Sequence, residues 1–283
     1  MNKQKRVVAI HDISCFGKCS LTVASPIISA AGIEVSMIPT AVLSTHTGGF
    51  TGFTFRDLTD DIIPIVDHWS NYNLEFDGIY TGYLGSFEQI ELMKQTFDRL
   101  KKDDTLIFVD PVMADNGKLY PLFPSDFPKG MRSLCAKADM IIPNITEACF
   151  MLGEAYLEGP YTKEYIESLL RRLSREIGPK KVVITGVYFD DVHLGAAVYN
   201  ADTDQVDYAF SHRIDGYYHG TGDVFASAVL AAVLSGSGLK EAIEIAVNFT
   251  VGSIKRTKEA QTDIRFGVNF EAGLKDLANI LNK

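Results

Sequence analysis

The sequence predicts an α/β fold in which a mostly parallel central sheet is covered by helices on both faces. Short apolar runs bounded by turn residues recur along most of the chain, and longer segments with helical periodicity separate them. Strands of a parallel sheet are buried on both faces and therefore have continuous apolar sequences. The 283 residues are 46% hydrophobic, enough for a substantial core. We expect a single domain over residues 1–283, because no linker, repeat or low-complexity segment interrupts the pattern.

The parallel strands and their helices can be placed in order. Six apolar runs predict strands at residues 6–10, 34–38, 78–81, 106–110, 140–143 and 181–185. Helical periodicity between them predicts helices at residues 20–31, 59–72, 86–102, 146–152 and 163–177. Ligands of such folds bind beyond the carboxyl ends of the strands. The unusual residue clusters of this chain fall at those ends.

The pattern changes after residue 185. Alternating residues predict two further strands at 193–200 and 205–212, which could cover a nucleotide or provide a contact surface. A long apolar helix is predicted after residue 220, and a second helix at 240–258. Residues 270–281 have the pattern of a final amphipathic helix.

Composition narrows the possible functions. The chain has 27 Lys and Arg against 36 Asp and Glu, a net charge of −9, and no basic block, so we expect neither nucleic acid nor a membrane as a partner. Residues 1–6 are basic, but the apolar run at 7–10 is too short for a signal peptide or a membrane span, which favours a cytoplasmic protein. The cysteines and histidines do not have zinc-binding spacing.

The most informative motif is Gly220, Thr221, Gly222 and Asp223, which opens the long apolar helix. The first turn of a helix has N–H groups without intrahelical partners and about half a positive charge from the macrodipole. Glycine lets an anion approach these groups closely. An aspartate beside a bound phosphate is suited to accept the proton of an attacking hydroxyl. Because Asp223 lies at the positive end of the helix, we expect its carboxylate to stay ionised. The alternative is a simple turn with a capping carboxylate.

Polar residues at the ends of three neighbouring strands predict a nucleotide and metal site. Asp110 follows the strand at 106–109 and is suited to bind Mg²⁺ or its water shell. Glu147 would add a second carboxylate, although Asn144 and Glu147 are also ordinary helix-cap residues. Thr185 ends the next strand, where it could contact the nucleotide or simply form a turn.

Residues after the first three strands predict a pocket for a small hydroxylated ligand. Asp12 follows the first strand, Thr47 lies in the segment 44–49, and Tyr83 could flank an aromatic substrate or be a buried structural residue. The segment 48–55, rich in Gly and Phe, predicts either a mobile loop over the ligand or an ordinary surface loop. Residues 17–20 end like a phosphate-binding P-loop but lack its first glycine, so they are not predicted to bind phosphate.

Together these motifs resemble the pyridoxal kinase branch of the ribokinase-like superfamily. The resemblance extends over residues 7–258 and rests on five segments in this order: Ser44-Thr45-His46-Thr47-Gly48, Thr81-Gly82-Tyr83, Asp110-Pro111-Val112-Met113-Ala114-Asp115, Pro143-Asn144-Ile145-Thr146-Glu147 and Gly220-Thr221-Gly222-Asp223. It implies a ribokinase-like three-layer αβα sandwich. It also implies ATP-dependent phosphorylation of the 5′-hydroxymethyl group of pyridoxal, pyridoxamine or pyridoxine.

The resemblance implies a role for each candidate residue. Asp223 matches the catalytic base, and Gly220, Thr221 and Gly222 match the anion hole. Asp110 and Glu147 match the residues around Mg²⁺ and the ATP phosphates, with Asn144 and Thr185 in the nucleotide region and Thr47 and Tyr83 beside the pyridine ring. The resemblance further implies a homodimer, with a monovalent cation as a candidate second ion.

One departure concerns the first strand, where the family has Ser-His-Val and this chain has Asp12-Ile13-Ser14. We hypothesise that Asp12 pairs with a ring hydroxyl or with the amine of pyridoxamine. Alternatives to a B6 kinase are a hydroxymethylpyrimidine kinase, a carbohydrate or nucleoside kinase, an ATP-dependent lyase of the same fold and a non-catalytic vitamin-binding relative. Thr47 and Tyr83 favour vitamin B6, and the intact Gly-Thr-Gly-Asp motif argues against a pure binder.

Overall fold

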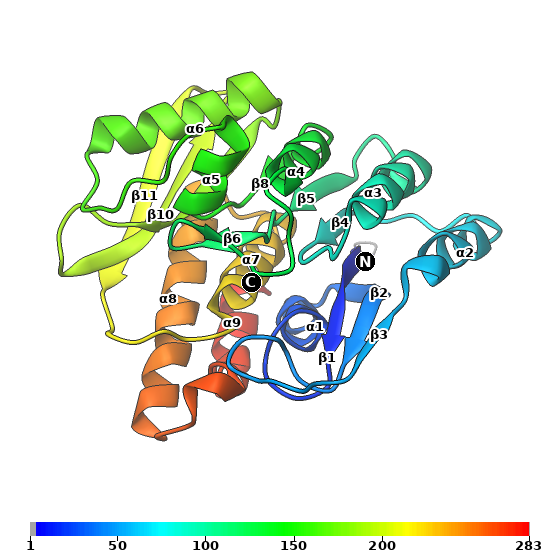
Figure 1. Cartoon of the computed structure of the whole chain (residues 1–283), viewed down its shortest axis with the longest axis horizontal. Helices are drawn as coiled ribbons and strands as arrows, with labels where there is room; N and C mark the ends of the chain where they lie inside the picture. Colours follow the sequence, from blue (N-terminus) through cyan, green and yellow to red (C-terminus); the bar gives the residue numbers. More distant parts are fainter. Residues whose placement is uncertain (1–3, 283) are drawn as a thin grey trace.

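A nine-stranded sheet forms the centre of the computed structural model, which describes residues 4–282 (Figure 1). Six neighbouring strands, β9, β8, β5, β4, β1 and β2, are parallel to one another. Strands β10, β11 and β3 each pair antiparallel with a neighbour. The spatial order is β11 (Gln205–His212), β10 (His193–Asn200), β9 (Lys181–Val187), β8 (Met140–Ile141), β5 (Leu106–Val109), β4 (Gly78–Thr81), β1 (Arg6–Ser14), β2 (Glu34–Leu43) and β3 (Phe55–Asp57).

Helices cover both faces because successive strand side chains point to opposite sides. Val8 and Ile10 of β1 belong to one core cluster, and Val7 belongs to the other. The first cluster includes residues of α2 (Thr59–Ser70), α3 (Phe87–Leu100), α4 (Phe127–Cys135), α5 (Ile145–Leu152) and α6 (Lys163–Ile177). The second includes residues of α1 (Leu21–Ala30), α7 (Thr221–Leu234), α8 (Leu239–Glu259) and α9 (Leu274–Leu281). The predicted αβα sandwich is therefore confirmed.

Helix α7, which begins with the Gly-Thr-Gly-Asp motif, is deeply buried. It packs against α1 and α8, and its residues from Val224 to Ala232 are all buried. A helix that is apolar on all sides is stable only in such an environment. The burial of α7 fixes the position of its first turn, which carries the Gly-Thr-Gly-Asp motif.

Several predicted boundaries coincide with the structure and others were wrong. The strands at 78–81, 193–200 and 205–212 and the helix at 163–177 match β4, β10, β11 and α6. Strand β1 continues to Ser14, so Asp12 lies within the strand rather than after it. Phe55 begins β3, which removes it from the predicted loop. Strands β10 and β11 extend the central sheet at one edge.

The sequence analysis missed α4, a short hairpin, the strand β3 and the 3₁₀ turn Ile264–Phe266. Helix α4 contains both Pro128 and Gly130, which weaken the helical pattern. The hairpin of β6 (Ala114–Asp115) and β7 (Lys118–Leu119) turns at Asn116 and Gly117, which have φ of 50° and 74°. Asn-Gly is the strongest short signal for such a turn, so this hairpin was detectable. The last predicted helix is divided into a 3₁₀ turn (Glu271–Gly273) and α9.

Within residues 4–282, no helix is both long enough and apolar enough to cross a membrane.

Candidate active site

The first turn of α7 is shaped for close approach by an anion. Gly220, the N-cap, has a left-handed backbone with φ of 74°, and a Cβ placed on it would lie 2.0 Å from the carbonyl oxygen of Lys18. Gly222 is exposed, and no atom lies within 4 Å of a Cβ placed there. Only glycine fits at Gly220, and the open space at Gly222 lets a ligand reach the free N–H groups of the turn.

Asp223 lies in this turn and accepts a hydrogen bond from the backbone N–H of Ser20, at 3.0 Å to Oδ2. Burial raises its pKa to about 6; the Ser20 N–H opposes this effect and the charge of Asp12 adds to it. Desolvation therefore has the largest effect on the pKa of Asp223. Asp223 remains mostly ionised at pH 7, with a pKa suited to a general base.

Ser20 connects Asp223 to Asp12. Its hydroxyl donates to Asp12 Oδ1 at 2.6 Å, while the Ser14 hydroxyl donates to Oδ2 at 3.1 Å. Asp12 is buried, and burial raises its pKa. Ser20 has φ of 56°, a left-handed conformation that is uncommon for serine. Both oxygens of Asp12 are thus used within the protein, which gives this residue a role in organising the site besides the hypothesised substrate contact.

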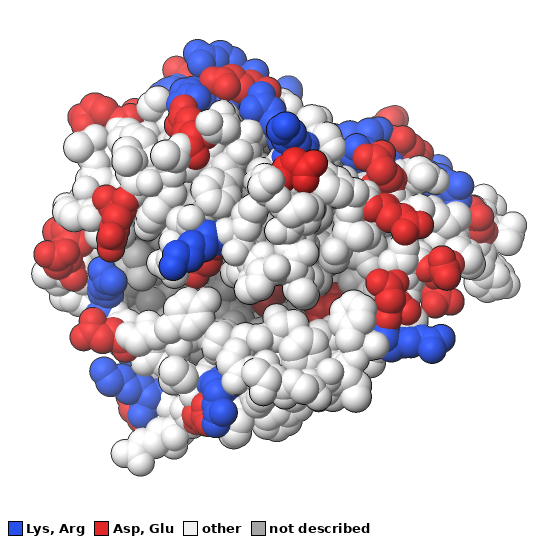
Figure 2. All heavy atoms as spheres, viewed as in Figure 1, with Lys and Arg blue, Asp and Glu red and all other residues white. Residues whose placement is uncertain are grey.

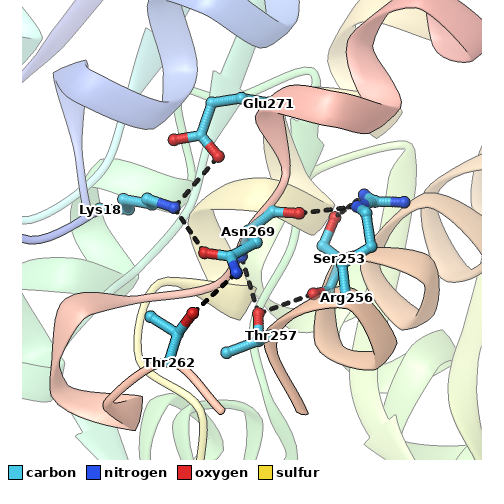
Figure 3. A network of polar contacts seen from close by, with 7 residues as sticks. All are labelled: Lys18, Ser253, Arg256, Thr257, Thr262, Asn269 and Glu271. Carbon is cyan, nitrogen blue, oxygen red and sulfur yellow. Dashed lines mark hydrogen bonds and ion pairs between the residues drawn. The ribbon is translucent and has the colours of Figure 1, made fainter. Parts of the chain in front are cut away.

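The segment that contains Ser20 is anchored by the C-terminal part of the chain (Figure 3). The Lys18 ammonium donates to Asn269 Oδ1 at 2.9 Å and to Glu271 Oε2 at 3.1 Å. Asn269 is held in turn by the Thr257 hydroxyl, which accepts from its N–H at 2.7 Å, and by Arg256, which donates to its carbonyl at 2.8 Å. The Lys18 ammonium therefore ties the segment before α1 to the C-terminal part of the chain.

Asp110 and Glu147 lie at the adjacent strand ends but have different surroundings. Glu147 accepts three backbone N–H groups, from Met113 and Ala114 on Oε1 at 2.9 and 3.4 Å and from Asn144 on Oε2 at 2.9 Å. The Asp110 carboxylate accepts no hydrogen bond from any residue of the described chain, 4–282. Burial raises the pKa of both, and the charges of Glu147 and Asp223 raise that of Asp110 further.

A divalent cation fits this arrangement. A buried carboxylate without a donor, beside two other carboxylates, is destabilised as an anion unless a cation neutralises it. Asp110 fits direct ligation, whereas Glu147, already bonded to three N–H groups, fits contact through a bound water. Across residues 4–282, His, Cys, Asp and Glu do not form groups of three arranged to hold a metal. Water and phosphate oxygens would have to complete the coordination sphere.

Asn144 and Thr185 are neighbours at the same edge of the sheet. Asn144 caps α5: its Oδ1 accepts from the Glu147 N–H at 2.9 Å, and its Nδ2 donates to the Ala114 carbonyl at 2.8 Å. Thr185 forms a parallel bridge with Asn144 and is partly buried. The Asn144 side chain is therefore occupied by capping, and its predicted nucleotide contact stays a proposal, as does that of Thr185.

The predicted substrate residues approach the site from β2 and β4. Tyr83 is partly buried against Phe123, with ring centroids 5.5 Å apart, and the charge of Asp12 contributes to its raised pKa. Thr47 is exposed. Its neighbour Gly48 packs on His219, since a Cβ at Gly48 would lie 2.5 Å from that ring. The segment after β2 thus reaches the start of α7.

The residues from the strand ends and from α7 converge electrostatically. Asp110 and Asp12 are each within reach of the Asp223 charge, and Tyr83 is within reach of Asp12. Figure 2 shows acidic atoms at the floor of a hollow near the centre of this face, with basic residues mostly toward the periphery.

Sequence reasoning missed Ser20, because no sequence pattern indicates a serine with positive φ between two carboxylates.

Comparisons with known proteins identify the family of this chain. The family model described as phosphomethylpyrimidine kinase matches residues 28–267. A Bacteroides thetaiotaomicron protein assigned as a phosphomethylpyrimidine kinase is 39% identical, covering 98% of this chain and 94% of its own, with a TM-score of 0.94. Its orthorhombic crystal form with pyridoxal gives 37% identity, coverage of 99% and 96%, and a TM-score of 0.91.

Pyridoxal kinases are similar over the same length. The Lactobacillus plantarum enzyme is 30% identical, covers 98% of each chain and has a TM-score of 0.89. The Dictyostelium discoideum enzyme is 26% identical and covers 92% of this chain and 89% of its own. These comparisons confirm the resemblance to the pyridoxal kinase branch. The chain therefore belongs to the phosphomethylpyrimidine kinase family and is a kinase of the branch that contains the pyridoxal kinases.

Proposed function

We propose that this protein transfers the γ-phosphate of ATP to the 5′-hydroxymethyl group of a B6 vitamer. The observation that carries the proposal is Asp223, an aspartate with a pKa of about 6, beside the open N-terminal turn of α7. The pyridoxal in the crystal form of the Bacteroides relative supports this substrate class.

The groups of the site have complementary roles in the transfer. Asp223 accepts the hydroxymethyl proton as the oxygen attacks phosphorus, and the N–H groups of the α7 turn donate to the transferring phosphoryl group. Ser20 holds Asp223 through its backbone N–H. We propose that Asp110 holds Mg²⁺ directly and Glu147 holds it through water; when bound, Mg²⁺ neutralises charge on the phosphates. Asn144 and Thr185 are proposed on the nucleotide side, and Asp12, Thr47 and Tyr83 on the vitamer side.

Parallel turnover assays test the substrate. We expect ATP- and Mg²⁺-dependent phosphorylation of at least one of pyridoxal, pyridoxamine and pyridoxine, measured as the phosphorylated product. Hydroxymethylpyrimidine belongs in the same assay, because the matching family model and the Bacteroides relative are both described as a phosphomethylpyrimidine kinase, which acts on a related pyrimidine. Turnover of hydroxymethylpyrimidine alone would contradict the B6 proposal, and release of free phosphate without a phosphorylated vitamin would indicate a lyase.

The pKa of Asp223 predicts the pH dependence. Since the ionised carboxylate is the base, kcat/KM should rise with pH up to about 6 and level off above it. The charge of Asp12 raises this pKa, so Asp12→Asn should move the acidic limb to lower pH. A pH profile of kcat/KM for both proteins measures the effect. An acidic limb that moves to higher pH in the variant would contradict the assignment.

The remaining features of the chain are also proposals. We place a single kinase domain over residues 1–283, of which 1–3 and 283 lie outside the described residues. We further propose a cytoplasmic homodimer. Met37 of β2 and Phe55 of β3 are exposed apolar residues at the β3 edge of the sheet, where a second copy could pack. Light scattering would distinguish dimer from monomer. A monovalent cation beside the nucleotide remains a candidate that potassium titration of the activity would test.

A further inference from the structure

Three polar side chains are buried behind the catalytic turn without hydrogen-bond partners. They are Tyr80 of β4, Ser227 of α7 and His11 of β1, all with no exposed surface. The Tyr80 hydroxyl, the Ser227 hydroxyl and both ring nitrogens of His11 have no partner among the described residues. Buried polar groups are rarely left unpaired, and when several occur together an internal water usually bonds to them.

The three groups are adjacent and lie on the face of the sheet that α7 covers. The rings of His11 and Tyr80 are 4.3 Å apart with an edge-to-face orientation. The Ser227 hydroxyl lies close enough to the Tyr80 hydroxyl to lower its pKa, although the two do not form a hydrogen bond of normal geometry. Ser227 is one helical turn after Asp223, so both residues lie on the same side of α7.

Tyr80 is also within electrostatic reach of the reaction site. The charges of Asp110 and Asp223, together with burial, raise its pKa, so the phenol stays protonated and can donate a hydrogen bond. Its ring is fixed on two sides, by His11 and by Phe108 at 5.1 Å. Because the side chain has no exposed surface, it is too deep to touch either substrate.

We propose that Tyr80 and Ser227 hold an internal water behind Asp223 and that Tyr80, through this water, is a positioning residue for the catalytic carboxylate. This inference rests on the proposed function, because it concerns the base of that reaction. The water satisfies the two hydroxyls and passes a hydrogen bond to the ionised carboxylate. His11 closes the far side of the water site with its neutral ring, which burial keeps unprotonated.

Steady-state kinetics of Tyr80→Phe test the positioning role. Loss of the hydrogen bond from Tyr80 to the water predicts a decrease in kcat of up to about tenfold, with KM for ATP and for the vitamer unchanged because Tyr80 does not touch them. Ser227→Ala should act in the same direction and provides a second test if Tyr80→Phe folds poorly. The double variant should lose no more than the stronger single variant, because both hydroxyls hold the same water.

Thr96→Val is the matched control. Thr96 also has a fully buried hydroxyl without a partner, but it lies on α3, across the sheet from α7. Its replacement removes an unpaired hydroxyl and should leave kcat and KM unchanged. A wild-type kcat in both Tyr80→Phe and Ser227→Ala, or a decrease of equal size in Thr96→Val, would overturn the proposal.

A high-resolution crystal structure of the wild-type protein separates this inference from the proposed function. Density for a water bonded to both Tyr80 and Ser227 is expected, and its absence would overturn the water site whatever substrate the enzyme uses. If the water is present but no B6 vitamer is phosphorylated, the proposed function fails and the water site stands. The kinetic comparison then applies to whichever substrate is turned over.

Discussion

We expect Asp223→Asn to lower kcat by about 10²- to 10⁴-fold, the usual contribution of a general base. Asparagine has nearly the same shape, and its amide oxygen can still accept the Ser20 N–H, so the turn keeps its geometry. Burial raises the pKa of Asp223, which means that the folded state disfavours the ionised carboxylate. A neutral asparagine removes this unfavourable charge, so folding should be preserved. The loss of turnover then reports proton transfer and not unfolding.

The measurement is kcat at saturating ATP and vitamer, together with thermal unfolding of the same preparation. Asp276→Asn is the matched control, because Asp276 occupies the first turn of α9 but is exposed to solvent. It should have wild-type kcat. Turnover near the wild-type value in a folded Asp223→Asn protein would show that another group accepts the proton.

We expect Asp110→Asn to remove at least about 99% of the activity while making the protein more stable at pH 8. Asp110 is buried beside Glu147 and Asp223, and their charges raise its pKa well above the ordinary value. The folded state therefore favours the protonated form of Asp110. The stability that this preference contributes is present at low pH and is lost as the pH rises through the folded-state pKa of Asp110. Asparagine removes this unfavourable charge but also removes the proposed Mg²⁺ ligand.

Thermal unfolding with and without Mg²⁺ measures both effects. The Tm of the variant should exceed that of the wild type at pH 8 by a few degrees, since about 1 kcal/mol shifts the Tm of a chain of this size by roughly 2–4 °C. The difference should shrink as the pH is lowered, because the wild-type carboxyl then gains a proton and loses its unfavourable charge. Added Mg²⁺ should raise the Tm of the wild type more than that of the variant. A variant that is less stable than the wild type at pH 8 would contradict this account.

Much of the fold could be predicted because its patterns are local. The bounds of β4, β10, β11 and α6 follow from apolar runs and periodicity alone, and the position of Asp223 follows from the two glycines beside it. Boundaries failed where tertiary pairing extended an element, as when β2 pairs with β1 beyond Ile10 and brings Asp12 into the strand.

The electrostatics of the site could not be predicted from the motif. The motif indicates an ionised Asp223 but not its raised pKa, because the burial that raises this pKa depends on segments distant in the chain. Ser20 and Tyr80 were missed for the same reason. Ser20 contacts Asp223 and Asp12 because its backbone has a positive φ. Tyr80 fits the apolar pattern of β4, and only the structure shows that its buried hydroxyl lies without a normal hydrogen bond. Both depend on contacts that adjacent residues do not encode.

The anchoring of Lys18 by Asn269 has a consequence for the timing of synthesis. The two residues are 251 positions apart, and a ribosome adding about 5–20 residues per second needs roughly 10–50 s to pass from one to the other. Until then, the turn that presents Ser20 to Asp223 lacks its C-terminal support. A nascent chain can therefore form much of the sheet while the segment that bonds to Asp223 is still unsupported, and we expect the enzyme to gain activity only as the last helices are completed.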